Sequence, residues 1–261
     1  FSFHSRKFSE LNKIIEGKKK FDFVIFDLGI SSLQILNLKR GFSFNSKSKV
    51  DMRMGLNSIS AHEVLNDFSL ATLNDIFKFF GEERESFNIA KNIIKERKKG
   101  PILSTPDLVE IIKRSKKKDF KKKINISTKT FQAIRIFVNK EFSELIEGLI
   151  NATQLIKAGG KIIVVSFHSI EDKIVKYFFK SLSEAKSVSR YMPKISSKKN
   201  LLNVVIKKPI LPSPKEIKEN PPSRSAKLRY AIKKHDFYNF ETDILDKFKY
   251  LIDIENYSKK L

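Results

Sequence analysis

FDFVIFDLG, residues 21–29, is an apolar run rich in Phe, Val and Ile that ends in an acidic residue and a glycine. Its short length and its β-branched and aromatic content favour a buried strand over a helix. A second apolar run, KIIVV at 161–165, is likewise followed by polar residues at 166–169. Strands of this kind, separated by helical patterns, are typical of α/β proteins. The sequence therefore predicts an α/β fold with a parallel sheet.

The chain between these two strands is predicted to be mostly helical. Ser60 and Glu63 form a capping-box pattern, and the apolar spacing from there to about residue 118 indicates several helices with no strand among them. Residues 29–55 show no sustained period and are interpreted as a long ordered loop. Residues 130–156 are predicted to form one helix, followed by a turn at 159–160.

Shorter elements are predicted in the last third of the chain. We expect a helix at 170–182, a basic loop at 186–200, a strand at 201–206 and a closing antiparallel strand at 225–232. Prolines between 209 and 222 argue against regular structure there. The tail is predicted to be a helix, with one apolar face formed by Phe240, Ile244, Leu245, Phe248 and Leu251.

The amino-acid composition limits the classes of function that we consider. A net charge of +23 and a pI near 9.9 point to a polyanionic partner such as nucleic acid, although a compositionally biased genome would also enrich the chain in Lys. The Lys runs at 116–118 and 121–123 are therefore interpreted as solvated loops. With no Cys and four scattered His, no disulfide or metal site is expected. No long apolar segment or signal segment is found, so we expect a cytoplasmic protein without membrane spans.

Polar residues follow both predicted strands. Ligands of open α/β sheets bind beyond the carboxyl ends of the strands, so 27–32 and 166–169 are the expected walls of a site. Asp27 and His168 are the side chains there with suitable chemistry. From the residues alone, Asp27 is equally well explained as a turn former.

Eight segments resemble, in order and spacing, signatures of the 16S rRNA cytosine-N4 methyltransferases, also called RsmH or MraW. The resemblance covers about residues 8–229. The segments are FDLGISSLQ (26–34), RGFSF (40–44), DMRM (51–54), GEER (81–84), TFQAIRIFVNKE (130–141), GGKIIVVSFHSIEDKIVK (159–176), KPILPSPKEI (208–217) and NPPSRSAKLR (220–229).

The resemblance implies a class I (Rossmann-like) methyltransferase domain with an inserted helical domain, acting with S-adenosylmethionine on a decoding-centre cytosine of the small ribosomal subunit. The methyltransferase domain would comprise 1–45 and 128–235, the insertion 46–127, and a helical tail 236–261. By motif, Phe8, Asp27 and Gln34 would contact the cofactor, with Phe8 on the adenine side. A homodimer is compatible with these features.

Some positions depart from the family pattern. Leu33 stands in place of Pro, residues 125–129 (NISTK) replace HPATR, and Pro222-Ser223 relaxes NPRAR. No Gly-rich loop of the type GTxGxGGHS is found either, and the chain is interpreted as lacking its first βα units. In isolation it is then expected to bind the cofactor poorly, to show no methyl transfer and to expose apolar surface at Val24 and Ile25 or their neighbours.

Methyl transfer to an exocyclic amine mainly requires alignment of the amine. Asp27 or Ser31 is expected to accept the amine N–H, and His168 to stack on or hydrogen-bond the base. Phosphate contacts are expected from Arg40, Arg53, Arg224, Lys227 and Arg229.

Two arginines within helical patterns, Arg84 and Arg135, are interpreted as members of structural ion pairs.

Two other functions are alternatives to the methyltransferase. One is a non-catalytic RNA-binding relative that has lost the cofactor. The other is a DNA amino-methyltransferase, whose (D/N/S)PP(Y/F) motif is replaced here by DLGISS.

Overall fold

The computed structural model describes residues 1–14, 20–55, 57, 59–116, 125–183, 200–235 and 241–257. The chain divides into two compact units. The sheet unit comprises Phe1–Gly29 and Ser143–Phe248, and the helical unit comprises Ile30–Phe142 and Lys249–Leu261. The predictions for 117–118, 121–123, 186–199 and Phe240 lie outside the described residues. No helix among the described residues has the length and apolar character needed to cross a membrane.

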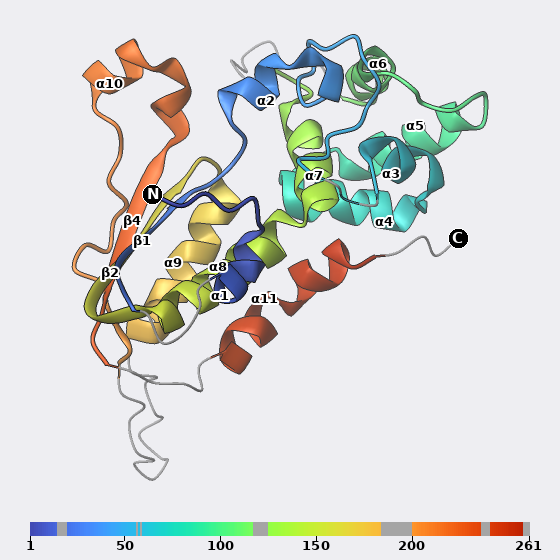
Figure 1. The fold of residues 1–261 in the computed structure, drawn as a ribbon. Coiled ribbons are helices and arrows are strands. Elements are labelled where there is room, and N and C mark those ends of the chain that lie inside the picture. The colour runs from blue at the N-terminus through green and yellow to red at the C-terminus, as the bar shows by residue number, and fades with distance from the viewer. Residues whose placement is uncertain are drawn as a thin grey trace. The chain divides into compact units, whose positions relative to one another are not determined.

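The sheet unit is built on four strands in the order β1-β2-β4-β3. They are β1 (Phe21–Asp27), β2 (Ile156–Ser166), β3 (Leu202–Asn203) and β4 (Lys227–Lys233). Figure 1 shows β1, β2 and β4 side by side. β1 and β2 are parallel, whereas β4 runs antiparallel to both β2 and β3. The predicted strands are confirmed, although β3 is shorter than expected. The expectation of a parallel sheet is correct only for the first pair, and the sheet is mixed.

Gly159 and Gly160 do not form the predicted turn, because β2 continues through them. Gly159 has a φ of +82°, which favours glycine, and the register of β1 with β2 shifts between Phe21 and Phe23. A Cβ on Gly160 would lie 3.0 Å from the carbonyl oxygen of Asp22. The two glycines therefore allow an irregular, close backbone pairing within the sheet.

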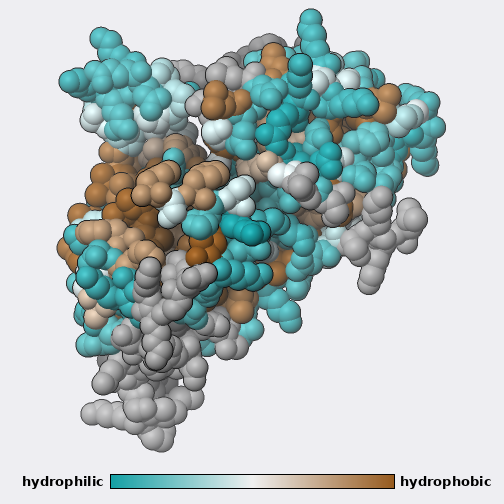
Figure 2. Space-filling view, viewed as in Figure 1, coloured by the Kyte–Doolittle hydropathy of each residue, from teal (hydrophilic) through white to brown (hydrophobic). Residues whose placement is uncertain are grey.

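The two faces of the sheet differ in how they are covered. Phe26, Val164 and Ala231 are buried on the face that packs against α9 (Ser169–Ser183) and the part of α8 (Glu141–Leu155) that belongs to this unit. On the other face, Phe23 and Ile25 of β1 are 56% and 66% exposed. Figure 2 shows hydrophobic side chains gathered over these strands. Exposure is thus found at Ile25, as expected, whereas Val24 is half-buried.

The predicted helical block lies in the helical unit, as α3 (Ala61–Asp67), α4 (Leu70–Asp75), the π-helical turn η3 (Ile76–Phe80), α5 (Ser86–Arg97) and α6 (Thr105–Ser115). The same unit also contains α7 (Thr128–Asn139), which was predicted as the start of the helix at 130–156 in the methyltransferase domain. The capping box is confirmed, because the backbone N–H of Ser60 donates to Glu63 Oε2 at 2.6 Å. Leu73, Ile76, Phe77 and Phe80 are fully buried, as their spacing predicts.

Residues 130–156 form two helices instead of the single helix expected. Lys140 adopts the left-handed conformation, with a φ of 52°, and ends α7 before α8 begins at Glu141. Side-chain periodicity continues across this residue, so the pattern alone cannot reveal the break.

Short helices also occur where loops were expected. Residues 29–55 contain α2 (Ser32–Leu36) and the 3₁₀ turn η2 (Leu38–Arg40). The proline-rich segment contains α10 (Pro214–Glu219) and the 3₁₀ turn η4 (Pro221–Ser225), because Pro is well tolerated at the first helical position. Near the amino end, η1 (Phe8–Glu10) leads into α1 (Leu11–Ile14).

The carboxyl-terminal helix α11 spans Glu241–Glu255. Ile244, Phe248 and Leu251 are buried as predicted. Leu245 is 38% exposed, so its assignment to the buried face is wrong.

Candidate functional site

The carboxyl end of β1 presents an acidic side chain to solvent. Asp27 is exposed, and it pairs in register with Val165 of β2. Within the described part of the chain, no hydrogen bond or ion pair engages its carboxylate. Because β1 and β2 are parallel, their carboxyl ends meet at one edge of the sheet. Ser166–Ser169 follows Val165, the partner of Asp27, at that edge. The predicted strand-end walls within the sheet unit are therefore brought together.

Gly29 lets the chain leave β1 in a sharp turn. Its φ of +91° is a conformation that other residues rarely adopt, and the N–H of Leu28 still donates to the carbonyl of Val165 at 3.0 Å. An added Cβ would lie 3.6 Å from the ring of Phe167, which is ordinary contact. The glycine is thus required by backbone conformation and not by lack of space.

Phe8 lies close to the same strand end. Its ring packs edge-on against Phe26, the residue before Asp27, with centroids 5.3 Å apart. A Cβ on Gly148 of α8 would lie 2.8 Å from Phe8 Cβ and 3.1 Å from Phe26. Only a glycine in the helix therefore leaves room for this aromatic pair. The ring of Phe8 remains 41% exposed and accessible to a flat ligand.

His168 is held at the start of α9 by Glu171, a residue that sequence reasoning missed. Glu171 is 3% exposed, and its Oε2 accepts from the backbone N–H groups of Phe167 and His168 at 2.9 and 3.3 Å. His168 Nδ1 accepts from the N–H of Glu171 at 3.3 Å, and its Nε2 lies 3.1 Å from Glu171 Oε1. The imidazole is therefore fixed in place, with only 10% of the side chain exposed.

In the helical unit, Ser31 and Gln34 cap α2 reciprocally. Ser31 Oγ accepts from the N–H of Gln34 at 3.2 Å, and Gln34 Oε1 accepts from the N–H of Ser31 at 2.9 Å. The geometry gives both side chains a structural part at the start of this short helix.

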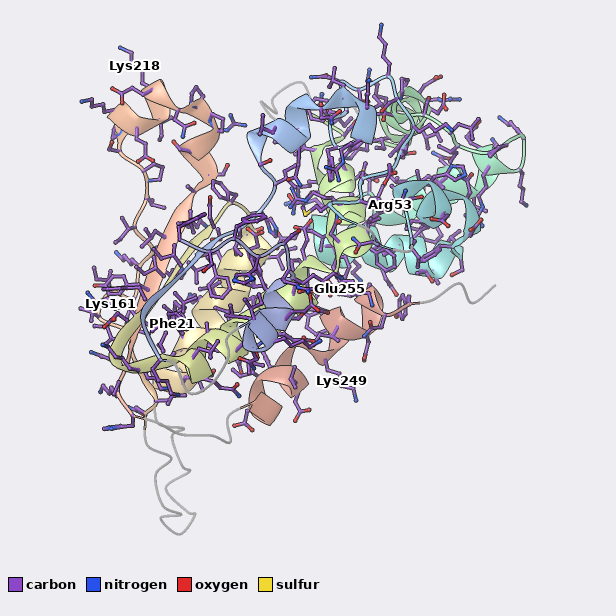
Figure 3. The ribbon with its side chains drawn as sticks, in the orientation of Figure 1. Phe21, Arg53, Lys161, Lys218, Lys249 and Glu255 are labelled. Carbon is purple, nitrogen blue, oxygen red and sulfur yellow. The ribbon has the colours of Figure 1, made fainter. Side chains whose placement is uncertain are left out.

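Arg40 and Arg53, two of the expected phosphate contacts, are held by internal partners. Arg40 donates to the carbonyl oxygens of Arg53 and Met54, and its guanidinium lies 5.3 Å from the centre of the Phe42 ring. Arg53 makes a bidentate pair with Asp51 at 2.7 and 2.9 Å and remains 37% exposed. Figure 3 labels Arg53 among the side chains of the helical unit. The hydrogen bond from Arg53 holds the pKa of Asp51 below its usual range, although burial acts in the opposite direction.

Asp172 of α9 forms ion pairs with two basic residues of β4, Lys227 and Arg229. The carboxylate, which is 8% exposed, accepts from Arg229 Nε at 2.6 Å and from Lys227 Nζ at 3.3 Å. Arg229 also donates to the carbonyl of Lys207 at 2.9 Å. Arg224 is exposed and forms no ion pair with the described residues. Of these three expected phosphate contacts, Arg224 is thus the most accessible.

The pair of Asp172 with Arg229 predicts a loss of stability in acid. Burial alone would raise the pKa of Asp172, but the hydrogen bonds and charges of Arg229 and Lys227 outweigh it and lower the pKa. A lowered pKa stabilises the folded state above the unfolded-state value of about 3.9, and this stabilisation is lost as pH falls through the folded-state pKa. Asp172→Asn should therefore melt at a lower temperature than wild type at neutral pH, and the difference should vanish in acid. Melting curves of the two proteins that remain parallel at every pH would contradict this expectation.

Arg135 and Arg84, which were both predicted to form structural ion pairs, differ from each other. Arg135 forms a bidentate pair with Glu141 at 2.8 and 3.0 Å, as expected for a structural ion pair. Arg84 is exposed and forms no ion pair with the described residues, contrary to expectation.

Glu83, the residue before Arg84, is 5% exposed and pairs with Lys116 Nζ at 2.5 Å. This buried pair was not predicted, because its members lie in separate segments of the chain.

Comparison with known proteins gives concordant matches. The family described as the MraW methylase family matches residues 1–234. Three similar proteins are each named ribosomal RNA small subunit methyltransferase H. That of Bartonella bacilliformis is 43% identical over 87% of this chain and 68% of its own length. Those of Ehrlichia canis and Caldicellulosiruptor saccharolyticus are 45% and 44% identical, over 88% and 87% of this chain and 76% and 75% of their own lengths.

Proposed function

The chain belongs to the MraW methylase family, and on that basis we propose that it is a methyltransferase of small-subunit ribosomal RNA that uses S-adenosylmethionine. The match across residues 1–234 carries this conclusion. The target that we propose is the exocyclic N4 of a decoding-centre cytosine in 16S rRNA, as the motifs in 26–34 and 159–176 imply.

The residues of the sheet unit fit a cofactor of this kind. An exposed carboxylate without a partner among the described residues, Asp27, stands at the strand end, and the exposed ring of Phe8 contacts the preceding residue. A carboxylate and an aromatic face suit a ligand with polar groups and an adenine ring. When bound, the cofactor would supply a methyl group that is already activated by a sulfonium. We propose that Phe8, Asp27 and, in the helical unit, Gln34 contact it.

Alignment of the amine is the contribution that we assign to the chain itself. The lone pair of the cytosine amine is delocalised into the ring, so an acceptor that holds its N–H localises the lone pair as the transition state forms. We propose Asp27 or Ser31 as that acceptor. His168, fixed by Glu171, is proposed to orient the base that has left its stack.

The phosphate contacts that we propose are Arg40, Arg53, Arg224, Lys227 and Arg229. Arg224 is fully available to RNA, whereas Lys227 and Arg229 share their charge with Asp172. These contacts would position the RNA without reading its sequence.

Transfer of a labelled methyl group tests the function directly. Two proteins are compared: the 261-residue chain, and a version with a family-like Gly-rich amino-terminal segment restored, called the restored protein. Each is incubated with methyl-labelled S-adenosylmethionine and either small ribosomal subunits or naked 16S rRNA, and mass spectrometry of the digested RNA locates the label. We expect N4-methylcytidine at one position of 16S rRNA with the restored protein, and no transfer by the chain alone. Label on another base would contradict the proposed target, and tight RNA binding without any transfer would support a non-catalytic RNA-binding protein.

A further inference from the structure

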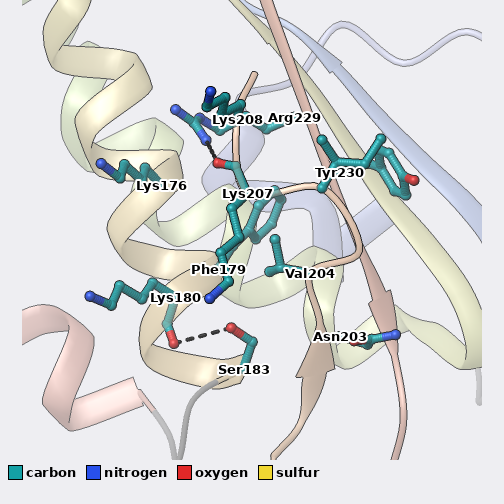
Figure 4. A pocket seen from close by; sticks show the side chains of 11 residues that line it. Lys176, Phe179, Lys180, Ser183, Asn203, Val204, Lys207, Lys208, Arg229 and Tyr230 are labelled. Carbon is teal, nitrogen blue, oxygen red and sulfur yellow. Dashed lines mark hydrogen bonds between the residues drawn. The ribbon is translucent and has the colours of Figure 1, made fainter. Parts of the chain in front are cut away.

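A cavity of about 550 Å³ lies in the sheet unit. It is bounded by the second half of α9, the segment 203–208 and the middle of β4 (Figure 4). The basic side chains around it are Lys176, Lys180, Lys207, Lys208 and Arg229. None of the described residues that line this lysine cavity is acidic.

The fold itself concentrates these charges. Residues 172, 176 and 180 recur every four positions and so share one face of α9. Arg229 joins Asp172 on that face to the carbonyl of Lys207, which holds the segment carrying Lys207 and Lys208 beside the helix. The wall and the rim of the cavity are thus fixed to each other by hydrogen bonds.

Three of these lysines, Lys176, Lys207 and Lys208, have no acidic residue among the described residues that line the cavity. Asp172 is the carboxylate on that face of α9, and it is already engaged by Arg229 and Lys227. Within the described part of the chain, Lys176, Lys207 and Lys208 form no ion pair, and all three are exposed. Like charges held close together repel one another, so a bound polyanion would relieve this repulsion.

The cavity is separate from Asp27, although Arg229, one of the proposed phosphate contacts, lines it. The cavity lies along β4 and the segment that continues from β3, whereas Asp27 ends β1 at the opposite edge of the sheet. β4 is two strand spacings from β1 and β3 is three, which correspond to roughly 10 and 14 Å. A continuous RNA strand can therefore reach both places.

We propose that the lysine cavity binds backbone phosphates of the substrate RNA, beyond the nucleotide that is methylated. This inference rests on the proposed function, because that function supplies the RNA. Several separate ammonium groups around an open hollow suit successive phosphates, which need point charges and no sequence readout. Phe179, which lines the cavity, is 2% exposed, so its ring offers no face on which a base could stack.

The test compares two triple variants that lose the same charge. The first carries Lys176→Gln, Lys207→Gln and Lys208→Gln. The control carries Lys91→Gln, Lys95→Gln and Lys98→Gln, which alter exposed residues on or next to α5 of the helical unit. Binding of a fluorescent single-stranded RNA from the target region is measured over a range of salt concentrations, with thermal melts of each variant.

We expect the cavity variant to bind RNA more weakly and to lower the log–log salt slope by about 0.7 for each phosphate that is no longer neutralised, or about 2 in all. The control should retain the wild-type slope, and both variants should melt like wild type. Equal slopes in the two variants would overturn the proposal. So would loss of pyrophosphate binding, measured by calorimetry, without any change in RNA binding, because the cavity would then serve a small polyphosphate.

Methyl transfer by the restored protein separates the two proposals. If transfer occurs and the cavity variant keeps its salt slope, the cavity proposal fails and the enzymatic function stands. If no transfer occurs but the slope still falls in the cavity variant alone, the RNA contact stands and the enzymatic function fails.

Discussion

In the restored protein, Asp27→Asn is expected to lower the rate of methyl transfer by at least about 100-fold, the effect of removing one preorganised polar group from a reacting centre. The carboxylate stands exposed at the strand end and has no partner among the described residues, so the fold does not depend on its charge. The thermal unfolding temperature should therefore stay at the wild-type value. Transfer of labelled methyl to small subunits and a melting curve measure the two effects.

Asp22→Asn provides the matched control for this experiment. Asp22 belongs to the same strand, is exposed and pairs with Lys157 at 2.5 Å. Its replacement should leave methyl transfer at the wild-type rate. Near-normal turnover by Asp27→Asn would remove Asp27 from the catalytic site. Equal losses in both variants would assign the effect to the strand and not to the carboxylate.

Glu83→Gln is expected to destabilise the helical unit by about 3–5 kcal/mol, because it leaves Lys116 buried without its counter-charge. The Lys116 side chain is 10% exposed, and its ammonium would then face neutral acceptors, the carbonyl of Ile126 at 2.5 Å and the amide oxygen of the substituted side chain. A loss of this size should lower the melting temperature by roughly 10 °C. Thermal and urea unfolding curves measure it.

Two further variants test whether the effect comes from the burial of the Glu83–Lys116 pair. Glu96→Gln removes the partner of Lys99, whose side chain is 63% exposed, and should change the unfolding curve little. Glu83→Gln combined with Lys116→Met removes both charges and should recover much of the stability. A single Glu83→Gln variant as stable as wild type would show that the pair contributes nothing.

Local patterns in the sequence predict most of the elements. The apolar run before Asp27 predicts β1, and the capping residues Ser60 and Glu63 predict the start of α3. The failures are of a different kind. Lys140 ends a helix in a left-handed conformation while the apolar period continues, and Gly159 adopts a positive φ inside a strand. Both depend on how the chain packs, which a local pattern does not record.

The sequence predicts some residues of the candidate site and misses others, for a related reason. Asp27 and His168 stand out because they follow apolar strands. Glu171 and Asp172 lie in a charged helical pattern that normally faces solvent, yet both are buried. Arg229 was expected to contact phosphate, but its acceptor Asp172 lies 57 positions away in the sequence. Such long-range partners become visible only in the folded chain.

The adjacency of β1 and β2 has a consequence for the order of folding. The two strands pair although Leu28–Leu155 separates them, and this connection is about ten times longer than a usual parallel crossover. Closing it from an unfolded chain costs roughly 2 kcal/mol of extra loop entropy. The segment 30–142 has a core of its own, with Leu73, Phe77 and Phe80 fully buried. Formation of that core would shorten the loop that must still be closed. We therefore expect the local helices to assemble early and the parallel strand pair to form late.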